Sequence, residues 1–306
     1  MANALFAGSA VCLVLFLHPY LTYIISLQFL RTAPLALGTA HTPTSATLVF
    51  AAYNEQAALP HKIANLRAIR KVCPNIEIIA FSDGSCDQTV TLLSQAGDIL
   101  RVIASPQRLG KAAGMRRMVR DARGEIVIFT DANVLLDPAS IQPLLRYFTD
   151  PGVGGVAGSL HYVNDDDGPT ARAGSFYWRL EESIKQQESR VGSIMGADGS
   201  IFAIRRKLYP VVPPDLLDDM TVSLSLTFAG FRLIHSASVI AYEKNATSAQ
   251  DEFRRKRRIA CRAFNTHRYL WPHLAHAYGP LNCYKYISHK LLRWLGLVPL
   301  LLCGHF

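Results

Sequence analysis

The hydrophobic positions of this chain form short runs through its middle and long runs at its two ends. Four short runs lie in the first half, at 47–52, 76–81, 99–104 and 125–130, with amphipathic segments between them. They are continuously apolar rather than alternating, which is typical of parallel strands covered on both faces. The spacing of about 25 residues leaves room for a helix between strands. The sequence therefore predicts an α/β fold with a Rossmann-like, mostly parallel sheet.

The second half of the pattern is less regular. It predicts strands at 153–162 and 231–241 and a glycine-rich turn at 196–204 that enters a short strand. Helical periodicity covers three further segments, which are 170–190, 218–230 and 248–269.

The long apolar run from Ala4 to Leu30 is of the length that crosses a bilayer as one helix, about 20 residues or more. A cleaved signal peptide is the competing interpretation, but the positive n-region is missing and the run is too long. We therefore predict a transmembrane helix over 1–31. The apolar run over 285–306 follows basic residues, and we expect it to be the truncated start of a second transmembrane helix.

The distribution of charge predicts on which side of the membrane the middle of the chain lies. The chain of 306 residues has a net charge of +9, and most of its Lys and Arg follow Arg31. The positive-inside rule then places the α/β domain, which we expect to span 45–262, on the cytoplasmic side of the inner membrane. Basic residues gather in 254–268, which favours anionic lipid and a nucleotide diphosphate as partners over nucleic acid. The stretch 263–284 is predicted to be an interfacial amphipathic segment.

Polar clusters follow three of the predicted strands, at Tyr53–Glu55, Asp83–Ser85 and Asp131–Asn133. In a parallel sheet the ligand binds beyond the carboxyl ends of the strands. Asp131 and Asn133 could hold Mg²⁺ or Mn²⁺ together with a donor's diphosphate, because hard cations take oxygen ligands. An Asx turn is the alternative there, and a capped strand-to-helix turn is the alternative at Asp83.

Charged residues further along the chain are candidates for catalysis. Asp218 and Asp219 open a predicted helix, where one of them could be a general base or both could be dipole-favoured caps. The cations of 255–258 could neutralise a leaving diphosphate or lie along a membrane surface. Lys111 could also approach phosphate.

In this order the motifs resemble those of family 2 glycosyltransferases of the GT-A fold, especially the membrane-bound ones related to cellulose, chitin and hyaluronan synthases. The resemblance covers about 45–259. It implies that the end of the first strand, Ala52, Tyr53 and Glu55, helps to hold the nucleoside, and that Asp83 contacts the nucleobase.

The same resemblance assigns the chemistry. It implies that Asp131 and Asn133 form the metal motif and that Asp219, with Asp218, supplies the catalytic base. The small-residue segment near the acceptor falls on 196–200, which includes Asp198 and Gly199.

Two departures from the family pattern bear on function. Asn133 replaces the second aspartate of the metal motif. In the segment that matches the glutamine-arginine-tryptophan motif of processive members, Arg258 keeps the cation but Ile259 replaces the tryptophan.

We therefore expect an inverting, metal-dependent glycosyltransferase that moves a sugar from a nucleotide-sugar donor, a UDP sugar by resemblance, to a polysaccharide or lipid-linked acceptor. A non-catalytic, nucleotide-binding membrane subunit of a synthase complex is the alternative.

Overall fold

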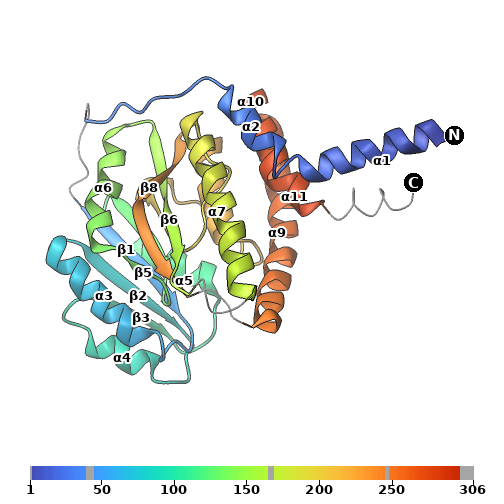
Figure 1. The fold of residues 1–306 in the computed structure, drawn as a ribbon. Coiled ribbons are helices and arrows are strands. Elements are labelled where there is room, and N and C mark those ends of the chain that lie inside the picture. The colour runs from blue at the N-terminus through green and yellow to red at the C-terminus, as the bar shows by residue number, and fades with distance from the viewer. Residues whose placement is uncertain (1, 39–44, 165–168, 245–247, 297–306) are drawn as a thin grey trace.

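The centre of the molecule is a sheet of eight strands, in the order β3-β2-β1-β4-β7-β6-β8-β5 (Figure 1). The computed structural model describes residues 2–38, 45–164, 169–244 and 248–296. The strands are β1 Ala46–Ala52, β2 Glu77–Asp83, β3 Arg101–Ser105, β4 Ile126–Asp131, β5 Leu135–Leu136, β6 Val153–Tyr162, β7 Ile201–Arg205 and β8 Arg232–Glu243.

The first four strands confirm the predicted parallel arrangement. β1 pairs in parallel with both β2 and β4, and β2 with β3. β7 then runs antiparallel between β4 and β6. The sheet is therefore mixed beyond β4, although β6 and β8 again pair in parallel.

Successive residues of each strand feed two separate apolar layers. Leu48 and Phe50 of β1 pack on one side, against α3 (Leu59–Val72), α4 (Thr89–Gln95) and α6 (Ile141–Arg146). Val49 packs on the other side, against α5 (Lys111–Asp121) and α8 (Asp218–Phe228). Burial on both faces explains why these strands read as continuous apolar runs.

Two long helices complete the fold beside the sheet (Figure 1). α7 spans Pro169–Arg190 and α9 spans Ala249–Ala277. The predicted domain boundary at 262 falls inside α9, which continues without a break. The sequence pattern did not reveal β5 and α6, because two- and six-residue elements are too short to show periodicity.

The N-terminal segment corrects the prediction of one transmembrane helix over 1–31. It consists of α1 (Ala2–Leu17) and α2 (Thr22–Gln28), separated by a turn that contains Pro19. Proline has no N–H to donate and clashes with the preceding helical turn. Within the described residues no single helix is long and apolar enough to span a bilayer. The helices Gly8–Leu17 and Thr22–Gln28, which are bent by 63° relative to each other, are long and apolar enough only when they are taken together.

The C-terminal segment also differs from the predicted start of a transmembrane helix. Its described part comprises α10 (Pro280–Tyr286), a π-helical turn (Ile287–Leu291) and α11 (Leu292–Trp294). Lys285 and His289 are fully buried there, against the protein rather than lipid. Polar groups so placed need internal partners. The remaining residues of the predicted span, 297–306, lie outside the described part of the chain.

The two end segments meet on α7 at one carboxylate. Glu188 accepts hydrogen bonds at the same oxygen from the Tyr23 hydroxyl of α2, at 2.5 Å, and from the ring of His289, at 2.9 Å. The other ring nitrogen of His289 contacts Glu181, which precedes Glu188 on α7, at 2.9 Å. Buried charges and a shared acceptor thus join α2, α7 and the C-terminal helices.

Candidate active site

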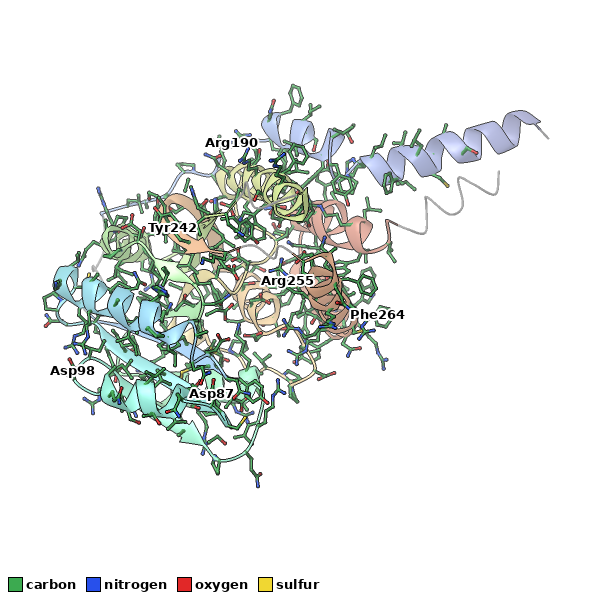
Figure 2. All side chains as sticks on the ribbon, turned by 60° about the horizontal axis from the view of Figure 1, so that its bottom comes forward. Asp87, Asp98, Arg190, Tyr242, Arg255 and Phe264 are labelled. Carbon is green, nitrogen blue, oxygen red and sulfur yellow. The ribbon has the colours of Figure 1, made fainter. Side chains whose placement is uncertain are left out.

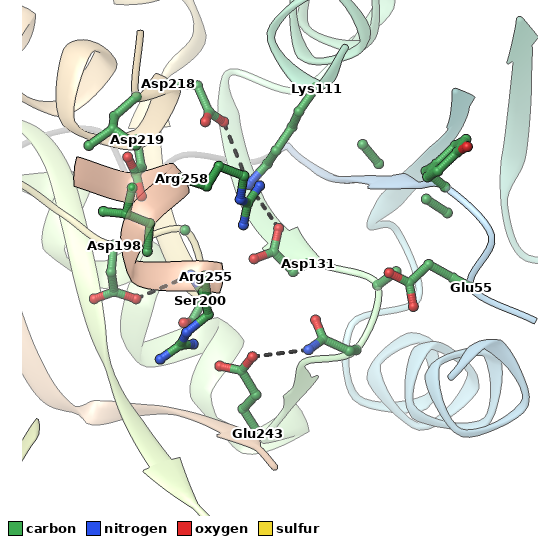
Figure 3. A pocket seen from close by; sticks show the side chains of 18 of the residues that line it. Glu55, Lys111, Asp131, Asp198, Ser200, Asp218, Asp219, Glu243, Arg255 and Arg258 are labelled. Atoms are coloured by element: carbon green, nitrogen blue, oxygen red, sulfur yellow. Dashed lines mark hydrogen bonds and ion pairs between the residues drawn. The ribbon is translucent and has the colours of Figure 1, made fainter. Parts of the chain in front are cut away.

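A cavity of about 730 Å³ opens at the carboxyl ends of β1, β2 and β4 (Figure 3). Every site residue predicted from the sequence lines it, although the segments come from across the chain. These residues are Ala52, Tyr53, Glu55, Asp83, Lys111, Asp131, Asn133, Asp198, Gly199, Asp218, Asp219 and Arg258. The structure brings these residues together around one cavity, and their individual roles remain predictions.

Lys111, at the first position of α5, links two of the acidic motifs. Its ammonium lies 2.9 Å from Asp131 Oδ1 and 3.6 Å from Asp218 Oδ2 (Figure 3). Burial lowers the pKa of Lys111, but the three carboxylates of Asp131, Asp218 and Asp219 more than offset it and hold that pKa well above its usual value. A permanent cation therefore lies between the strand-end acid and the acids of α8.

Asp219 is in the opposite situation, because little stabilises its negative charge. Burial and the neighbouring charge of Asp218 raise the pKa of the Asp219 carboxyl to about 7, even though Lys111 opposes the rise. Its side chain accepts a hydrogen bond from the Met220 backbone N–H, at 2.7 Å. A carboxyl whose pKa lies near the working pH is suited to accept a proton.

Gly199 leaves a space where these groups converge. A Cβ atom built on it would lie 3.2 Å from Lys111 Nζ, 3.5 Å from Asp131 Oδ2 and 3.6 Å from Asp219 Oδ2. Any side chain at this position would enter the region between the strand-end acid and the predicted base. The glycine predicted near the acceptor thus keeps open the centre of the site.

The charge of Asp198 is balanced by a buried lysine of α7. It accepts a hydrogen bond from the buried Lys185 of α7, at 2.8 Å, and one from the backbone N–H of Ser200, at 3.1 Å. Lys185 also lies 4.6 Å from the centre of the Trp178 ring. These contacts fix the loop that carries Gly199.

Asn133 is oriented by a residue that the sequence did not single out. Its Nδ2 donates to Glu243 Oε1 at 3.0 Å, and within the described part of the chain the amide oxygen has no hydrogen-bond donor beside it. Burial and the charge of Asp131 raise the pKa of Glu243 to about 7. Glu243 ends β8, and only the sheet order, with β8 beside β5, brings it to this motif.

The donor set of this region fits a hard divalent cation. Asp131 and Asn133 present oxygens, and burial and the charge of Asp131 raise the pKa of the nearby Glu243 carboxyl although Arg255 opposes the rise. Among the described residues, no three His, Cys, Asp or Glu side chains are grouped as a ready-made metal site. A cation here would depend on water and a bound diphosphate for its remaining ligands, as Mg²⁺ usually does.

Asp83 has a structural role that the sequence left open. It is buried, and its carboxylate accepts hydrogen bonds from the backbone N–H groups of Leu109 and Gly110, at 2.6 and 3.0 Å. Gly84 follows with φ of 68°, and a Cβ there would approach Arg108 N to 2.7 Å. Asp83 and Gly84 therefore position the loop that precedes Lys111.

Arg108 is a second residue that the sequence analysis missed. Its guanidinium lies 3.9 Å from the centre of the Tyr53 ring, so the two side chains stack at the mouth of the cavity. Stacking of guanidinium on an aromatic ring is favourable, by about 0.5–1 kcal/mol at exposed sites. The sequence analysis singled out Lys111, but the pairing of Arg108, three residues before it, with a residue 55 positions earlier was not visible in the sequence.

One side of α9 closes the cavity with cations. Arg255, Arg258 and Arg262 all line it, at helical spacing, together with Ile259. Figure 3 shows Arg258 beside Lys111 and the acids of α8. The wall opposite the strand-end acid is therefore positively charged and has no aromatic side chain at Ile259.

A mixed α/β sheet with carboxylates and cations around a cavity at its strand ends defines a site for a phosphorylated, metal-chelating ligand such as a nucleotide sugar. Residues 47–211, more than half of the chain, match the model of the family described as glycosyl transferase family 2. The chain belongs to this family. The predictions of family and of enzyme class, a glycosyltransferase, are confirmed.

Curated relatives are distant. The chain is 23% identical over 217 residues to an N-acetylglucosaminyltransferase of Sinorhizobium fredii, which covers 65% of this chain and 52% of that protein. It is 22% identical over 220 residues to the O-antigen chain rhamnosyltransferase RfbN of Salmonella typhimurium, covering 68% and 69%. The chain thus spans about half the length of the first of these relatives.

Solved structures agree on the fold. The mannosyltransferase PcManGT from Pyrobaculum calidifontis, in complex with GDP-Man and Mn²⁺, superposes with a TM-score of 0.79 at 18% identity and covers 98% of this chain and 85% of its own. TarS 1–349 of S. aureus with UDP-GlcNAc gives a TM-score of 0.52 at 14% identity, covering 72% and 67%. The predicted GT-A fold is confirmed.

Proposed function

We propose that this protein transfers a sugar from a nucleotide-sugar donor with inversion at the anomeric carbon, assisted by Mg²⁺ or Mn²⁺. The observation that carries the proposal is the convergence of Asp131, Lys111 and Asp219 on the space left by Gly199. In this proposal Asp131 serves the metal-bound diphosphate and Asp219 serves the incoming nucleophile. A bound cation would supply charge neutralisation of the diphosphate, held by Asp131 and the amide oxygen of Asn133.

The protein's own residues would perform the remaining steps. Asp219, with its pKa near 7, takes the proton of a hydroxyl acceptor, or of a phosphate acceptor in its monoprotonated form, as that acceptor's oxygen attacks the anomeric carbon and the nucleoside diphosphate leaves. Arg258 and Lys111 stabilise the leaving nucleoside diphosphate, because cations aimed at developing charge lower the barrier. Tyr53, stacked on Arg108 at the mouth of the cavity, offers a flat surface on which the donor's nucleobase can lie.

The donor is proposed to be a UDP sugar, on the resemblance to family members that use one. A GDP sugar is the alternative, since PcManGT binds GDP-Man and TarS binds UDP-GlcNAc.

For the acceptor, the three arginines of α9 favour a lipid-linked phosphate over a neutral glycan. Guanidinium groups pair with phosphate oxygens, whereas sugar rings bind on aromatic faces. On α9 Ile259 offers no such face, and the aromatic rings of Tyr162 and Trp178 line the cavity from other elements. A relative of Pectobacterium atrosepticum, 32% identical over a third of this chain, is an undecaprenyl-phosphate 4-deoxy-4-formamido-L-arabinose transferase. Polymer synthesis on a polysaccharide acceptor is the second candidate.

Release of nucleoside diphosphate from a panel of UDP and GDP sugars tests this function. We expect the full chain in detergent with Mn²⁺ to release product from one donor, and a polyprenyl phosphate acceptor to raise the rate at least tenfold. A single glycolipid product supports the lipid acceptor, and a ladder of products supports polymer synthesis. No release from any donor, with both acceptors present, would leave the non-catalytic subunit as the better interpretation.

We also propose that the protein works on the cytoplasmic side of a membrane. α1 projects away from the sheet (Figure 1), and Val11, Val14 and Leu15 on it are 58%, 61% and 41% exposed. Phe264, on the outer side of α9 (Figure 2), is 69% exposed, whereas Arg255 lies toward the middle of the molecule. Exposed apolar groups near cations suit an anionic lipid surface.

Flotation with anionic phospholipid vesicles tests this attachment. The protein should float with vesicles even in 0.5 M NaCl (about 4 Å Debye length), because apolar burial is not screened by salt. Replacing Val11, Val14 and Leu15 by serine should lower the bound fraction at limiting lipid at least tenfold, since each side chain contributes about 1.5–3 kcal/mol when buried. The matched control is Val72→Ser with Val211→Ser, exposed on other elements. Equal flotation of both variants would contradict the proposal.

A further inference from the structure

A lysine is buried directly beneath the turn that carries the predicted metal-binding side chains. Lys62 belongs to α3, on the face that packs against the sheet, and its side chain has no exposed surface. A buried ammonium costs several kcal/mol unless its charge and its hydrogen bonds are satisfied. Its retention in the apolar layer therefore needs a reason.

The partners of Lys62 supply that reason. Its Nζ donates to Thr130 Oγ1, at 3.3 Å, and to the backbone carbonyl of Val134. These two groups flank Asp131–Asn133 on either side. Lys62 therefore connects the last buried residue of β4 to the first residue after the motif.

Asn65, one helical turn further along α3, holds the next part of the same segment. Its Nδ2 donates to the Leu136 carbonyl at 2.7 Å, and its Oδ1 accepts from the Leu136 N–H at 2.9 Å. A side-chain amide that satisfies both backbone groups of one residue replaces a missing strand partner. Lys62 and Asn65 thus fix both ends of the segment from the same helix face.

The sheet holds the two ends of this segment, through the pairing of β4 with β1 and of β5 with β8, so residues 132–134 between them lie outside both ladders. Within the turn, the backbone bond from Val134 N to Asp131 O is long, at 3.3 Å. The side chains above it face the cavity: Asp131 toward Lys111, and Asn133 toward Glu243. Asp131 also interacts with Lys62, because its charge opposes the fall of the Lys62 pKa, to about 7, that burial causes.

We propose that Lys62 and Asn65 are positioning residues, which hold the turn 131–134 so that Asp131 and Asn133 can bind a divalent cation and the donor's diphosphate. This inference rests on the proposed metal-assisted function. Neither residue reaches the cavity, so both act through the turn. A loosened turn would bind the cation more weakly while leaving the nucleoside end of the cavity, around Tyr53, unchanged.

The test compares Lys62→Met and Asn65→Leu with Ile69→Ala. Ile69 is fully buried on the same helix and makes no hydrogen bond to the turn, so its variant controls for destabilised packing. The first readout is Mn²⁺ binding, measured from the electron paramagnetic resonance signal of free Mn²⁺. The titration is made in the presence of the nucleoside diphosphate that the wild-type protein releases, or of UDP if it releases none. The second is the Mn²⁺ concentration for half-maximal release of nucleoside diphosphate, together with kcat at saturating Mn²⁺.

We expect Lys62→Met and Asn65→Leu each to weaken Mn²⁺ binding at least tenfold, with kcat partly restored by excess Mn²⁺. Ile69→Ala should lower the melting temperature by a similar amount but shift Mn²⁺ binding by less than twofold. If all three variants shift it equally, the inference is wrong while the metal-assisted function stands. If the wild-type protein binds no Mn²⁺ at all, both fail. Should Lys62→Met not fold, Asn65→Leu alone decides between these outcomes.

Discussion

Replacing Asp219 by asparagine should lower the rate of sugar transfer by about 10³-fold while leaving binding of nucleoside diphosphate within about twofold, because a positioned base contributes 10²–10⁴-fold. Asparagine keeps the size of the side chain and removes its ability to take a proton. Steady-state release of nucleoside diphosphate and isothermal titration with the same product measure the two quantities.

The neighbouring carboxylate provides the matched control. Asp218 lies 3.6 Å from Lys111 and shares the start of α8, so Asp218→Asn alters the same charge balance. We expect a smaller loss, of about tenfold, since Asp218 acts through Lys111 and through the pKa of Asp219. If Asp218→Asn is the more damaging change, the assignment of the base must be exchanged between the two residues.

The pH profile gives a second measurement on Asp219. Its pKa is raised to about 7, and a general base works only when deprotonated. The value of kcat/KM should therefore fall tenfold per pH unit below about pH 7 and level off above it. In Asp218→Asn the descending limb should move to lower pH, because the like charge that raises the pKa has been removed. If the descending limb of the Asp218→Asn profile stays at the same pH, a group other than Asp219 controls the pH dependence.

The second large effect is expected for Asp131→Asn. This change should reduce metal-dependent release of nucleoside diphosphate at least 10³-fold, because one oxygen ligand loses its charge and Lys111 loses its nearest partner, at 2.9 Å. Unlike Asp219→Asn, it should also weaken nucleoside diphosphate binding in Mn²⁺, by about 100-fold, which is about 2.7 kcal/mol.

A carboxylate far from the site controls for the loss of charge. Asp98 is exposed and pairs with Arg67, so Asp98→Asn should change neither quantity by more than twofold. Retention of Mn²⁺-dependent binding in Asp131→Asn would remove this residue from the metal site and would favour the Asx-turn interpretation of the motif.

The local pattern of apolar residues predicted the first four strands, because strands buried on both faces of a parallel sheet are continuously apolar in sequence. The ends of those strands then located the cavity, since ligands of such sheets bind there. Other features depend on contacts between distant residues. Glu243 meets Asn133, and Arg108 meets Tyr53, only after β8 and the loop before α5 are in place.

One sequence signal, Pro19, was open to a better interpretation, whereas another, Lys62, was not. Pro19 lies inside the apolar run and marks the break between α1 and α2, although composition alone favoured one helix. Lys62 reads as a solvent-exposed position of an amphipathic helix, and only the carbonyl of Val134 and the hydroxyl of Thr130 make its burial possible.

The carboxylate of Glu188 defines the smallest piece of this chain that can be handled alone. Because Tyr23 and His289 share it, trimming either end would remove one of the three hydrogen-bond partners of this buried charge, the third being the Met195 backbone N–H, at a cost of about 3–5 kcal/mol. That is a large fraction of the stability of an ordinary domain. The enzymatic core and the segments proposed to meet the membrane are therefore one cooperative unit.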